Sequence, residues 1–310
     1  MLYPSIENYI VQNILFRANS SSTIGTGHIM RDLVLAEQFK DVKIIFATQD
    51  LPGNINHKIE ERNYVIEIIN SNDLEELVDV IKNHLIDMIV IDNYEINYAF
   101  EKALKEITGV TVFVIDDTYE KHYCDILLNH NVYGDSSKYK GLVPEKCEVR
   151  CGSSYTLLRN EFIKEKQKGR QSIDNAKQLN AFISMGGSDH TNISIKILEV
   201  LKKFSNIYSH VVTTTSNKNL NELEKYVSSQ KNIALHINSN SIAQLMNNSN
   251  FAIVSPSVTI NEILYLEIPF IAIKTAENQK YMYKFIKKLN LKILKEFSAE
   301  ELKCSIEEFE

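Results

Sequence analysis

The chain of 310 residues contains no tryptophan, only five prolines and ten glycines, and four cysteines. The cysteines, at positions 124, 147, 151 and 304, are too few and too scattered for a disulfide framework. Cys147 and Cys151 are spaced as C-x-x-x-C, but no second pair completes a zinc site. We therefore expect buried, reduced thiols, no metal and no cofactor, as is typical of a cytoplasmic protein.

Long hydrophobic runs are also missing. No stretch of 18 apolar residues occurs, and the first residues, MLYPSIENYIVQN, lack the basic residues that begin a signal peptide. Lysine and arginine number 34 against 40 acidic residues, for a net charge of −6, and no basic stripe interrupts this balance. We therefore expect neither a membrane nor a nucleic acid as a partner. Nothing in the sequence demands more than a monomer.

What is present is a regular alternation of short apolar runs and helix-period segments. Strands are predicted at 14–18, 42–47, 65–69, 88–91, 112–115, 181–184, 210–214, 233–237, 251–254 and 270–273. Helices are predicted at 28–39, 73–84, 98–107, 193–204, 220–228, 242–247, 258–266 and 279–289. Continuous apolar strands that are each followed by a helix indicate parallel sheets covered on both faces.

This series runs twice, and the chain is long enough for two cores. The pattern predicts two doubly wound, Rossmann-like α/β domains, residues 1–159 and 180–310, with a cleft between them. The polar segment 160–179 is interpreted as a linker, with a helical start, at which the domains close. Ligands of such sheets bind at the carboxyl ends of the strands, so the residues directly after each strand are the candidates for a site.

The first strand leads into SSSTIGTGHIMRDLVLAEQF, which places a histidine at the start of a helix. Gly25 and Gly27 allow a turn that brings backbone N–H groups close to a ligand. The positive end of the helix dipole disfavours imidazolium at His28, so a neutral ring there could accept a proton from water. Asp92 and Tyr94, which follow the fourth strand, could orient this ring or the water. The alternative is a purely structural turn of small residues in which the histidine has no catalytic or binding role.

Asp117, which follows the fifth strand, is interpreted as a cap of the next helix, and no role is assigned to His122 or His130.

In the second domain, small or polar residues again follow a strand and precede a helix, at three places. A diphosphate could bind at Gly186, Gly187 and Ser188, and again at Ser257, while a carboxylate and amides further on could read the hydroxyl and N-acetyl groups of a sugar. The candidates for these contacts are Asn261, Glu262, Asn278 and Gln279. Ordinary strand-to-helix loops also contain glycine and serine, so each of these stretches has a purely structural alternative.

Taken together, these residues resemble a known family. From about Ile14 to about Leu291 the chain is similar to the UDP-sugar hydrolases of pseudaminic acid biosynthesis. The resemblance rests on SSSTIGTGHIMRDLVLA, IDDTYEKHYCDILLN, YKGLVPEKCEVRCGSSYTLLRNEF, MGGSD and SVTINE, in this order. The second domain alone also resembles the peptidoglycan N-acetylglucosaminyltransferase, which implies the GT-B architecture with a UDP-sugar in the C-terminal half.

The resemblance implies specific roles for several residues. His28 matches the catalytic histidine of the family, Glu262 falls in its UDP-binding S-x-x-x-N-E motif, and Tyr94 and Asn278 match residues that line its active site. The chain departs from the pattern at Asn93, where relatives often carry a histidine, which leaves a second-histidine role without support.

The implied reaction is hydrolysis of UDP-2,4-diacetamido-2,4,6-trideoxy-β-L-altropyranose at the anomeric C1–O bond, in a pathway toward nonulosonic acids and flagellin glycosylation. The expected mechanism is metal-independent and inverting, with His28 as general base. The alternatives are a GT-B glycosyltransferase, a hydrolysing epimerase of a UDP-N-acetylamino sugar, and a sensor that binds a UDP-sugar without turnover.

Overall fold

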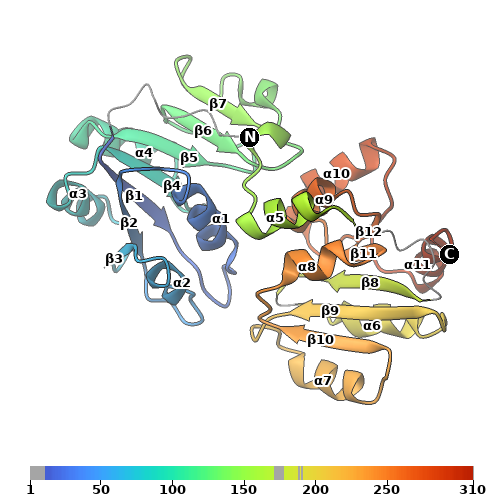
Figure 1. Ribbon diagram of the computed structural model, residues 1–310. Helices are drawn as coiled ribbons and strands as arrows, with labels where there is room; N and C mark the ends of the chain where they lie inside the picture. The colour runs from blue at the N-terminus through green and yellow to red at the C-terminus, as the bar shows by residue number, and fades with distance from the viewer. Residues whose placement is uncertain (1–10, 171–177, 188, 190, 310) are drawn as a thin grey trace. The chain divides into compact units, whose positions relative to one another are not determined.

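The computed structural model describes residues 11–170, 178–187, 189 and 191–309 (Figure 1). The chain divides into two compact units, Met1–Leu157 and Leu158–Glu310. Within the described residues, each unit contains one sheet whose strands all pair in parallel. The predicted class, two doubly wound α/β domains, is therefore confirmed.

The first unit is built on a seven-stranded sheet of order β3-β2-β1-β4-β5-β6-β7. Its strands are β1 (Asn13–Ala18), β2 (Lys43–Thr48), β3 (Val65–Ile68), β4 (Met88–Asp92), β5 (Thr111–Ile115), β6 (Ile126–Asn129) and β7 (Glu148–Cys151). Its helices are α1 (Gly27–Ala36), α2 (His57–Glu60), α3 (Leu74–Asn83) and α4 (Tyr98–Thr108), with short 3₁₀ turns η1 (Ser136–Tyr139) and η2 (Ser153–Tyr155).

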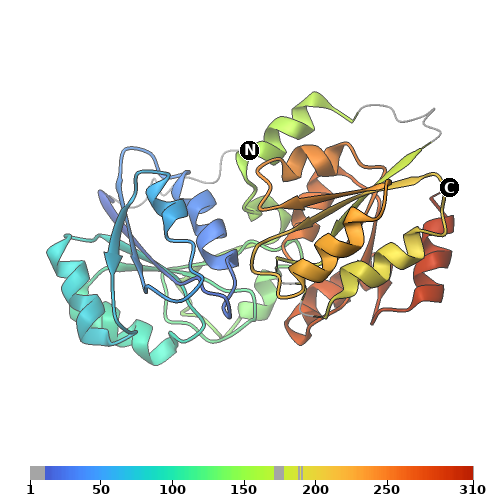
Figure 2. The same cartoon turned by 90° about the horizontal axis from the view of Figure 1, so that it is seen from below.

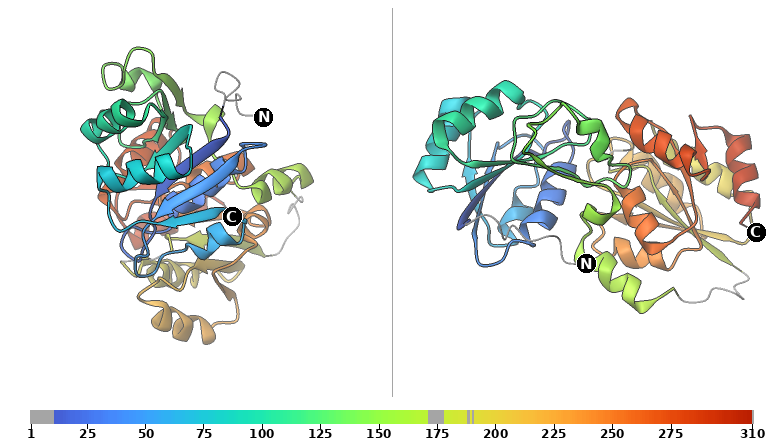
Figure 3. Two further views of the ribbon diagram at one scale, coloured as in Figure 1. Left: turned by 90° about the vertical axis from the view of Figure 1, so that its left-hand side faces the viewer. Right: turned by 90° about the horizontal axis from the view of Figure 1, so that it is seen from above.

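Alternate residues of β1 explain why its middle, Ile14–Phe16, is continuously apolar. Leu15 packs into one core with the inner sides of α3 and α4, whereas Ile14 and Phe16 pack into a second core with α1 and α2. Figure 3 shows α3 and α4 on one face of this sheet and α1 and α2 on the other. A strand buried on both faces needs an apolar side chain at nearly every position.

The second unit is built on a six-stranded sheet of order β10-β9-β8-β11-β12-β13. Its strands are β8 (Leu179–Ser184), β9 (Ile207–Thr213), β10 (Ile233–Ile237), β11 (Phe251–Val254), β12 (Phe270–Ile273) and β13 (Ile293–Leu294). Its helices are α5 (Asn160–Lys168), α6 (Ile193–Leu201), α7 (Leu220–Ser228), α8 (Ile242–Asn247), α9 (Thr259–Leu266), α10 (Lys280–Lys288) and α11 (Ala299–Glu307), with a 3₁₀ turn η3 (Glu277–Gln279). Helices α6, α7 and α11 share one core with the sheet, and α5 lies on the opposite side from α6 and α11 (Figure 2).

Two segments differ from a simple strand–helix series. The irregular stretch after β5 adds β6 and β7 to the first sheet, and residues 160–168 of the predicted linker form α5, which contacts α8 and α9. A hinge within 160–179 stays a prediction, and residues 171–177 lie outside the described residues.

The cysteines correct one expectation from the sequence. All four are free, but only Cys124 is buried; Cys147 and Cys151 are half-buried, and Cys304 is exposed. The prediction of buried thiols was therefore wrong for these three residues. Cys304 is exposed because it lies on the outer side of α11, whose buried residues are Leu302 and Ile306.

Over the described part of the chain, no helix combines the length and the apolar character needed to cross a bilayer.

Candidate active site

The strand order of the first sheet reverses between β1 and β4, which are neighbours in space but not in sequence. Ala18, the last residue of β1, is paired with Asp92, the last residue of β4. The chain leaves β1 toward α1 and leaves β4 toward α4, on opposite faces of the sheet. Such a switch point is where doubly wound sheets bind their ligands. The fold itself therefore brings the start of α1 next to Asp92.

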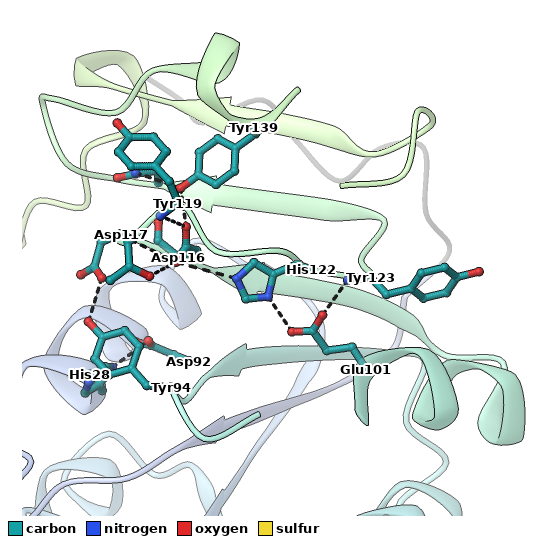
Figure 4. Close-up of polar contacts among 12 residues, drawn as sticks. His28, Asp92, Tyr94, Glu101, Asp116, Asp117, Tyr119, His122, Tyr123 and Tyr139 are labelled. Atoms are coloured by element: carbon teal, nitrogen blue, oxygen red, sulfur yellow. Dashed lines mark hydrogen bonds and ion pairs between the residues drawn. The ribbon is translucent and has the colours of Figure 1, made fainter. Parts of the chain in front are cut away.

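His28 and Asp92 form a direct pair at this point (Figure 4). His28 Nδ1 lies 2.7 Å from Asp92 Oδ1, and the two side chains are 11% and 0% exposed. A carboxylate only accepts hydrogen bonds, so Nδ1 carries the proton and donates it to Asp92. The opposite tautomer would let Nδ1 accept from Arg31 Nη2, 3.1 Å away, but it would place two lone pairs 2.7 Å apart. Nε2 therefore keeps a lone pair that can accept a proton.

Arg31 fixes the carboxylate that orients His28. Its Nε donates to Asp92 Oδ2 at 2.6 Å, and its Nη2 donates to Oδ1 at 2.5 Å. Burial alone would raise the pKa of Asp92, but the charge of Arg31 and the hydrogen bonds from Arg31 and His28 hold that pKa well below its usual range. Burial would likewise lower the pKa of Arg31, but Asp92 and Asp117 raise it above its ordinary value. Asp92 is therefore an anion and Arg31 a cation near neutral pH.

The sequence reasoning missed Arg31, although a signal was present. Arg31 follows His28 by three positions, which places both side chains on one face of α1. The letters IMRDLVLA put the charged residues Arg31 and Asp32 in an apolar helix, and both are buried in the structure. Asp32 has no hydrogen-bond partner for its carboxyl oxygens within the described residues, and burial, followed by the charge of Asp92, raises its pKa well above the usual range. Asp32 therefore takes up a proton more readily than an exposed carboxyl group.

Tyr94 lies beside the histidine and is held by Asp117. Its hydroxyl donates to Asp117 Oδ1 at 2.7 Å, and its ring meets the His28 ring edge-on, with centroids 4.9 Å apart (Figure 4). Asp117 Oδ2 in turn accepts from Arg31 Nη1 at 2.9 Å. The Tyr94 side chain as a whole is exposed, but desolvation around its hydroxyl, then the charge of Asp117, raises the pKa of Tyr94 above its ordinary value, so the phenol stays protonated near neutral pH. The interpretation of Asp117 as a helix cap was wrong, because no helix follows β5 and the carboxylate is used by Arg31 and Tyr94 instead.

A second buried network lies beside this site and includes His122, which had been given no role. His122 Nδ1 lies 2.7 Å from Glu101 Oε1, and its Nε2 lies 3.7 Å from Asp116 Oδ1 (Figure 4). Asp116 also accepts from the hydroxyl of Tyr139 at 2.6 Å and from the backbone N–H of Tyr119 at 2.8 Å. This network ties the loop after β5 to α4 and η1. It supports the loop that carries Asp117.

The loop before His28 is open. Gly25 has φ +88°, a conformation that favours glycine, and a Cβ on Gly25 or Gly27 would meet no atom within 4 Å. The N-cap residue of α1, Thr26, makes no side-chain capping bond. Space and uncapped amide groups are therefore present where the sequence placed a ligand, although no contact tests that role.

The second sheet has its own switch point between β8 and β11. Gly186 and Gly187 follow β8, and Gly186 has φ +83°. The oxygens of Asp189 accept from the N–H groups of Ile193 and Ser194, each at 3.0 Å, so a carboxylate already occupies the start of α6. Ser188 lies outside the described residues. A diphosphate at this loop would meet the charge of Asp189.

Helix α9 begins differently. Its N-cap residue, Val258, offers no side-chain cap, and Ser257 lies just before it. Glu262, in the first turn, is held by Arg159, whose Nη2 donates to Glu262 Oε1 at 3.0 Å. Burial raises the pKa of Glu262, and Arg159 opposes that rise. Asn261 is buried in the same turn.

The two amides after β12 differ in their settings. Asn278 is exposed, whereas Gln279 is bonded within its own turn: its Oε1 accepts from the backbone N–H groups of Thr275, at 2.8 Å, and Ala276, at 3.2 Å. Their roles toward a sugar stay predictions.

A metal could be considered only where ligands cluster. In the regions described, no group of three or more His, Cys, Asp or Glu side chains could hold one.

Solved structures share this fold. A glycosyltransferase from Rickettsia africae superposes with a TM-score of 0.62 over 97% of this chain and 88% of its own, at 14% identity. A UDP-GlcNAc 2-epimerase from Neisseria meningitidis does so with a TM-score of 0.61 over 96% and 91%, at 13% identity. At such identities the likeness shows the fold alone, which is that of the GT-B enzymes, as expected.

Sequence comparison identifies the family. No family model matches the chain. The UDP-2,4-diacetamido-2,4,6-trideoxy-beta-L-altropyranose hydrolase of Campylobacter jejuni, however, is 44% identical over 267 residues, which are 86% of this chain and 93% of that protein. The chain belongs to the family of this UDP-sugar hydrolase.

Proposed function

We propose that this protein hydrolyses UDP-2,4-diacetamido-2,4,6-trideoxy-β-L-altropyranose to UDP and the free sugar. The substrate is that named for the relative from C. jejuni, which is 44% identical over most of both chains. The observation that carries the chemistry is the 2.7 Å pair of His28 and Asp92, because it leaves one imidazole nitrogen able to take a proton.

The proposed step is a displacement at the anomeric carbon. His28 Nε2 takes a proton from water as the water oxygen bonds to C1. The C1–O bond breaks, and its electron pair stays on the β-phosphate oxygen of UDP. Attack opposite the leaving group gives the inverted anomer. A positioned general base contributes about 10²- to 10⁴-fold to a rate, and Asp92 stabilises the imidazolium that forms.

The proposed UDP site lies in the second unit. Helix α9, without a side-chain cap and with Ser257 before it, offers N–H groups and the positive end of a dipole to the diphosphate. Glu262, one turn on, would accept hydrogen bonds from the ribose hydroxyls. Developing charge on the leaving diphosphate would be stabilised by the same helix end, so the proposed step needs no metal. Asn278 is proposed to contact the acetamido groups.

The test is a proton NMR time course with this UDP-sugar, for wild type, His28→Ala and His57→Ala. His57 is the matched control because it is exposed and begins α2. Release of UDP with an inverted sugar, lost in His28→Ala and kept in His57→Ala while UDP still binds, is the expected result. Unchanged turnover in His28→Ala would sink the role of the base, and a product epimerised at C2 would favour the epimerase alternative.

The bond that breaks is checked in ¹⁸O-water. Cleavage of C1–O leaves the released UDP unlabelled, whereas attack at phosphorus would put the label into UDP.

A further inference from the structure

Arg159 makes three contacts that the reaction does not explain. Its Nη1 lies 2.6 Å from Glu161 Oε1, its Nη2 donates to Glu262 Oε1 at 3.0 Å, and its guanidinium carbon lies 4.8 Å from the centroid of the Phe162 ring. Phe162 is fully buried, so its ring is held by the packing around it. A guanidinium fixed at three points has lost most of its rotamer freedom before any ligand binds.

The contact with Glu262 joins two helices of the second unit. Arg159 is the N-cap residue of α5, and Glu262 lies in the first turn of α9. The Glu262 side chain is only 16% exposed. A half-buried carboxylate without a counter-charge would take up a proton more readily, and a protonated Glu262 would be a poorer acceptor for hydroxyl groups.

The geometry also leaves part of Glu262 available. Arg159 contacts Oε1, and a carboxylate has about four lone-pair sites on its two oxygens. Oε2 can therefore accept from a diol while Oε1 stays on the arginine. An acceptor that is ionised and already oriented costs less to use than one that must be ordered by the ligand.

We propose that Arg159 is a positioning residue for nucleotide recognition: it holds the Glu262 carboxylate in the orientation and charge state that bind the ribose hydroxyls of UDP. This inference rests on the proposed function, in which Glu262 contacts the ribose. The ligand itself need not touch Arg159.

A second ion pair between the same helices supplies a matched control. Lys166 of α5 lies 2.8 Å from Glu267 Oε2, just after the last residue of α9. Lys166→Met removes a bond between α5 and α9 without touching Glu262. Arg159→Met keeps the aliphatic stem of the arginine and removes its charge, its hydrogen bonds and its guanidinium contact with Phe162.

The experiment measures the binding of UDP and of 2′-deoxy-UDP by calorimetry for wild type, Arg159→Met, Lys166→Met and Glu262→Gln. The readout is the ratio of the two affinities, in which the titration of the diphosphate cancels. Loss of one hydrogen bond to a charged acceptor predicts a ratio of about tenfold or more in wild type. We expect the ratio to fall below about threefold in Arg159→Met and Glu262→Gln, and to stay at the wild-type value in Lys166→Met.

The pH dependence separates positioning from general support. Burial raises the pKa of Glu262, and without Arg159 nothing offsets that rise. As the pH is lowered, the ratio of the affinities for UDP and 2′-deoxy-UDP should therefore reach one at a higher pH in Arg159→Met than in wild type. A merely structural arginine would weaken both nucleotides equally and leave the ratio and its pH profile unchanged.

The outcomes distinguish the two proposals. If Glu262→Gln loses the ratio but Arg159→Met keeps it, the role of Arg159 is overturned and the ribose site stands. If wild type does not discriminate between the nucleotides, the ribose assignment of Glu262 fails, and the inference fails with it.

Discussion

Arg31 and Asp92 form a two-point ion pair, with Nε 2.6 Å from Oδ2 and Nη2 2.5 Å from Oδ1. The third nitrogen of the same guanidinium binds Asp117, which accepts the hydroxyl of Tyr94. One side chain therefore fixes the acceptors of both rings in the proposed catalytic site. The orientation of His28 depends on a residue that need not touch the substrate.

Replacing Arg31 tests this dependence. Arg31→Lys keeps the charge but cannot make the planar two-point contact, so we expect kcat to fall while the fold persists. Arg31→Met leaves Asp92 buried without a counter-charge, which costs about 3–5 kcal/mol in the free energy of unfolding. Chemical denaturation and steady-state kinetics measure both effects. The double variant Arg31→Met, Asp92→Asn should recover part of the lost stability, and wild-type kcat in Arg31→Lys would contradict the prediction.

Asp92→Asn probes the tautomer of His28. An amide is nearly the same shape as the carboxylate but can donate to Nδ1, which would move the ring proton to Nε2. The expected fall in kcat is on the order of 10³- to 10⁴-fold, the scale seen when an orienting aspartate of a catalytic histidine becomes asparagine. The KM should change little. A loss of less than tenfold would show that the orientation of the ring does not limit the reaction.

Two substitutions of Tyr94 distinguish the contribution of its ring from that of its hydroxyl. Tyr94→Phe keeps the edge-on contact with His28 and removes only the bond to Asp117, so we expect a stability change of about 1 kcal/mol and a kcat within about tenfold of wild type. Tyr94→Ala also removes the ring, and its loss of activity should be larger. Equal effects of the two variants would assign the whole role to the hydroxyl.

The His122 network predicts a pH-dependent stability. Burial alone would lower the pKa of His122, but the carboxylates of Asp116 and Glu101 raise it to about 9. Because the folded-state pKa exceeds that of the unfolded chain, this stability is complete below about pH 6.5 and is lost as the pH rises through 9. We expect the stability difference between wild type and His122→Gln to shrink by roughly 3 kcal/mol between pH 6 and pH 9.5.

The contribution of Asp116 to stability depends on pH in the opposite direction. Burial would raise its pKa, but its hydrogen bonds lower it to about 2, so its contribution is present above about pH 4 and fades as the pH falls through 2. Urea titrations at several pH values measure both limbs. A stability difference for His122→Gln that does not vary with pH would rule out the charged histidine.

The centres of the sheets were predictable because β1, β4, β8 and β11 each contain at least three consecutive apolar residues that are buried. Strand β7 was missed for the opposite reason. It is four residues long, lies at the edge of its sheet, and has only one buried side chain, Arg150. The conformation of such a strand depends on its pairing with β6, and its own sequence shows no apolar run.

The candidate site shows the same division. His28 and Asp92 could be found because strand ends and helix starts can be read locally. The role of Arg31 could not, since its partners lie 61 and 86 positions further along the chain. Asp117 was misread because a local rule, the helix cap, was applied where a distant charge determines the contact.

The open loop before His28 has a consequence for how this scaffold can diverge. The proposed base and its carboxylate partner lie on α1 and β4, whereas a Cβ on Gly25 or Gly27 in the turn before them would meet no atom within 4 Å. We therefore expect a side chain at position 27 to change what this loop can bind while the pair of His28 and Asp92 is kept. We expect proteins of this fold with other specificities to differ in this turn and to keep His28 and Asp92.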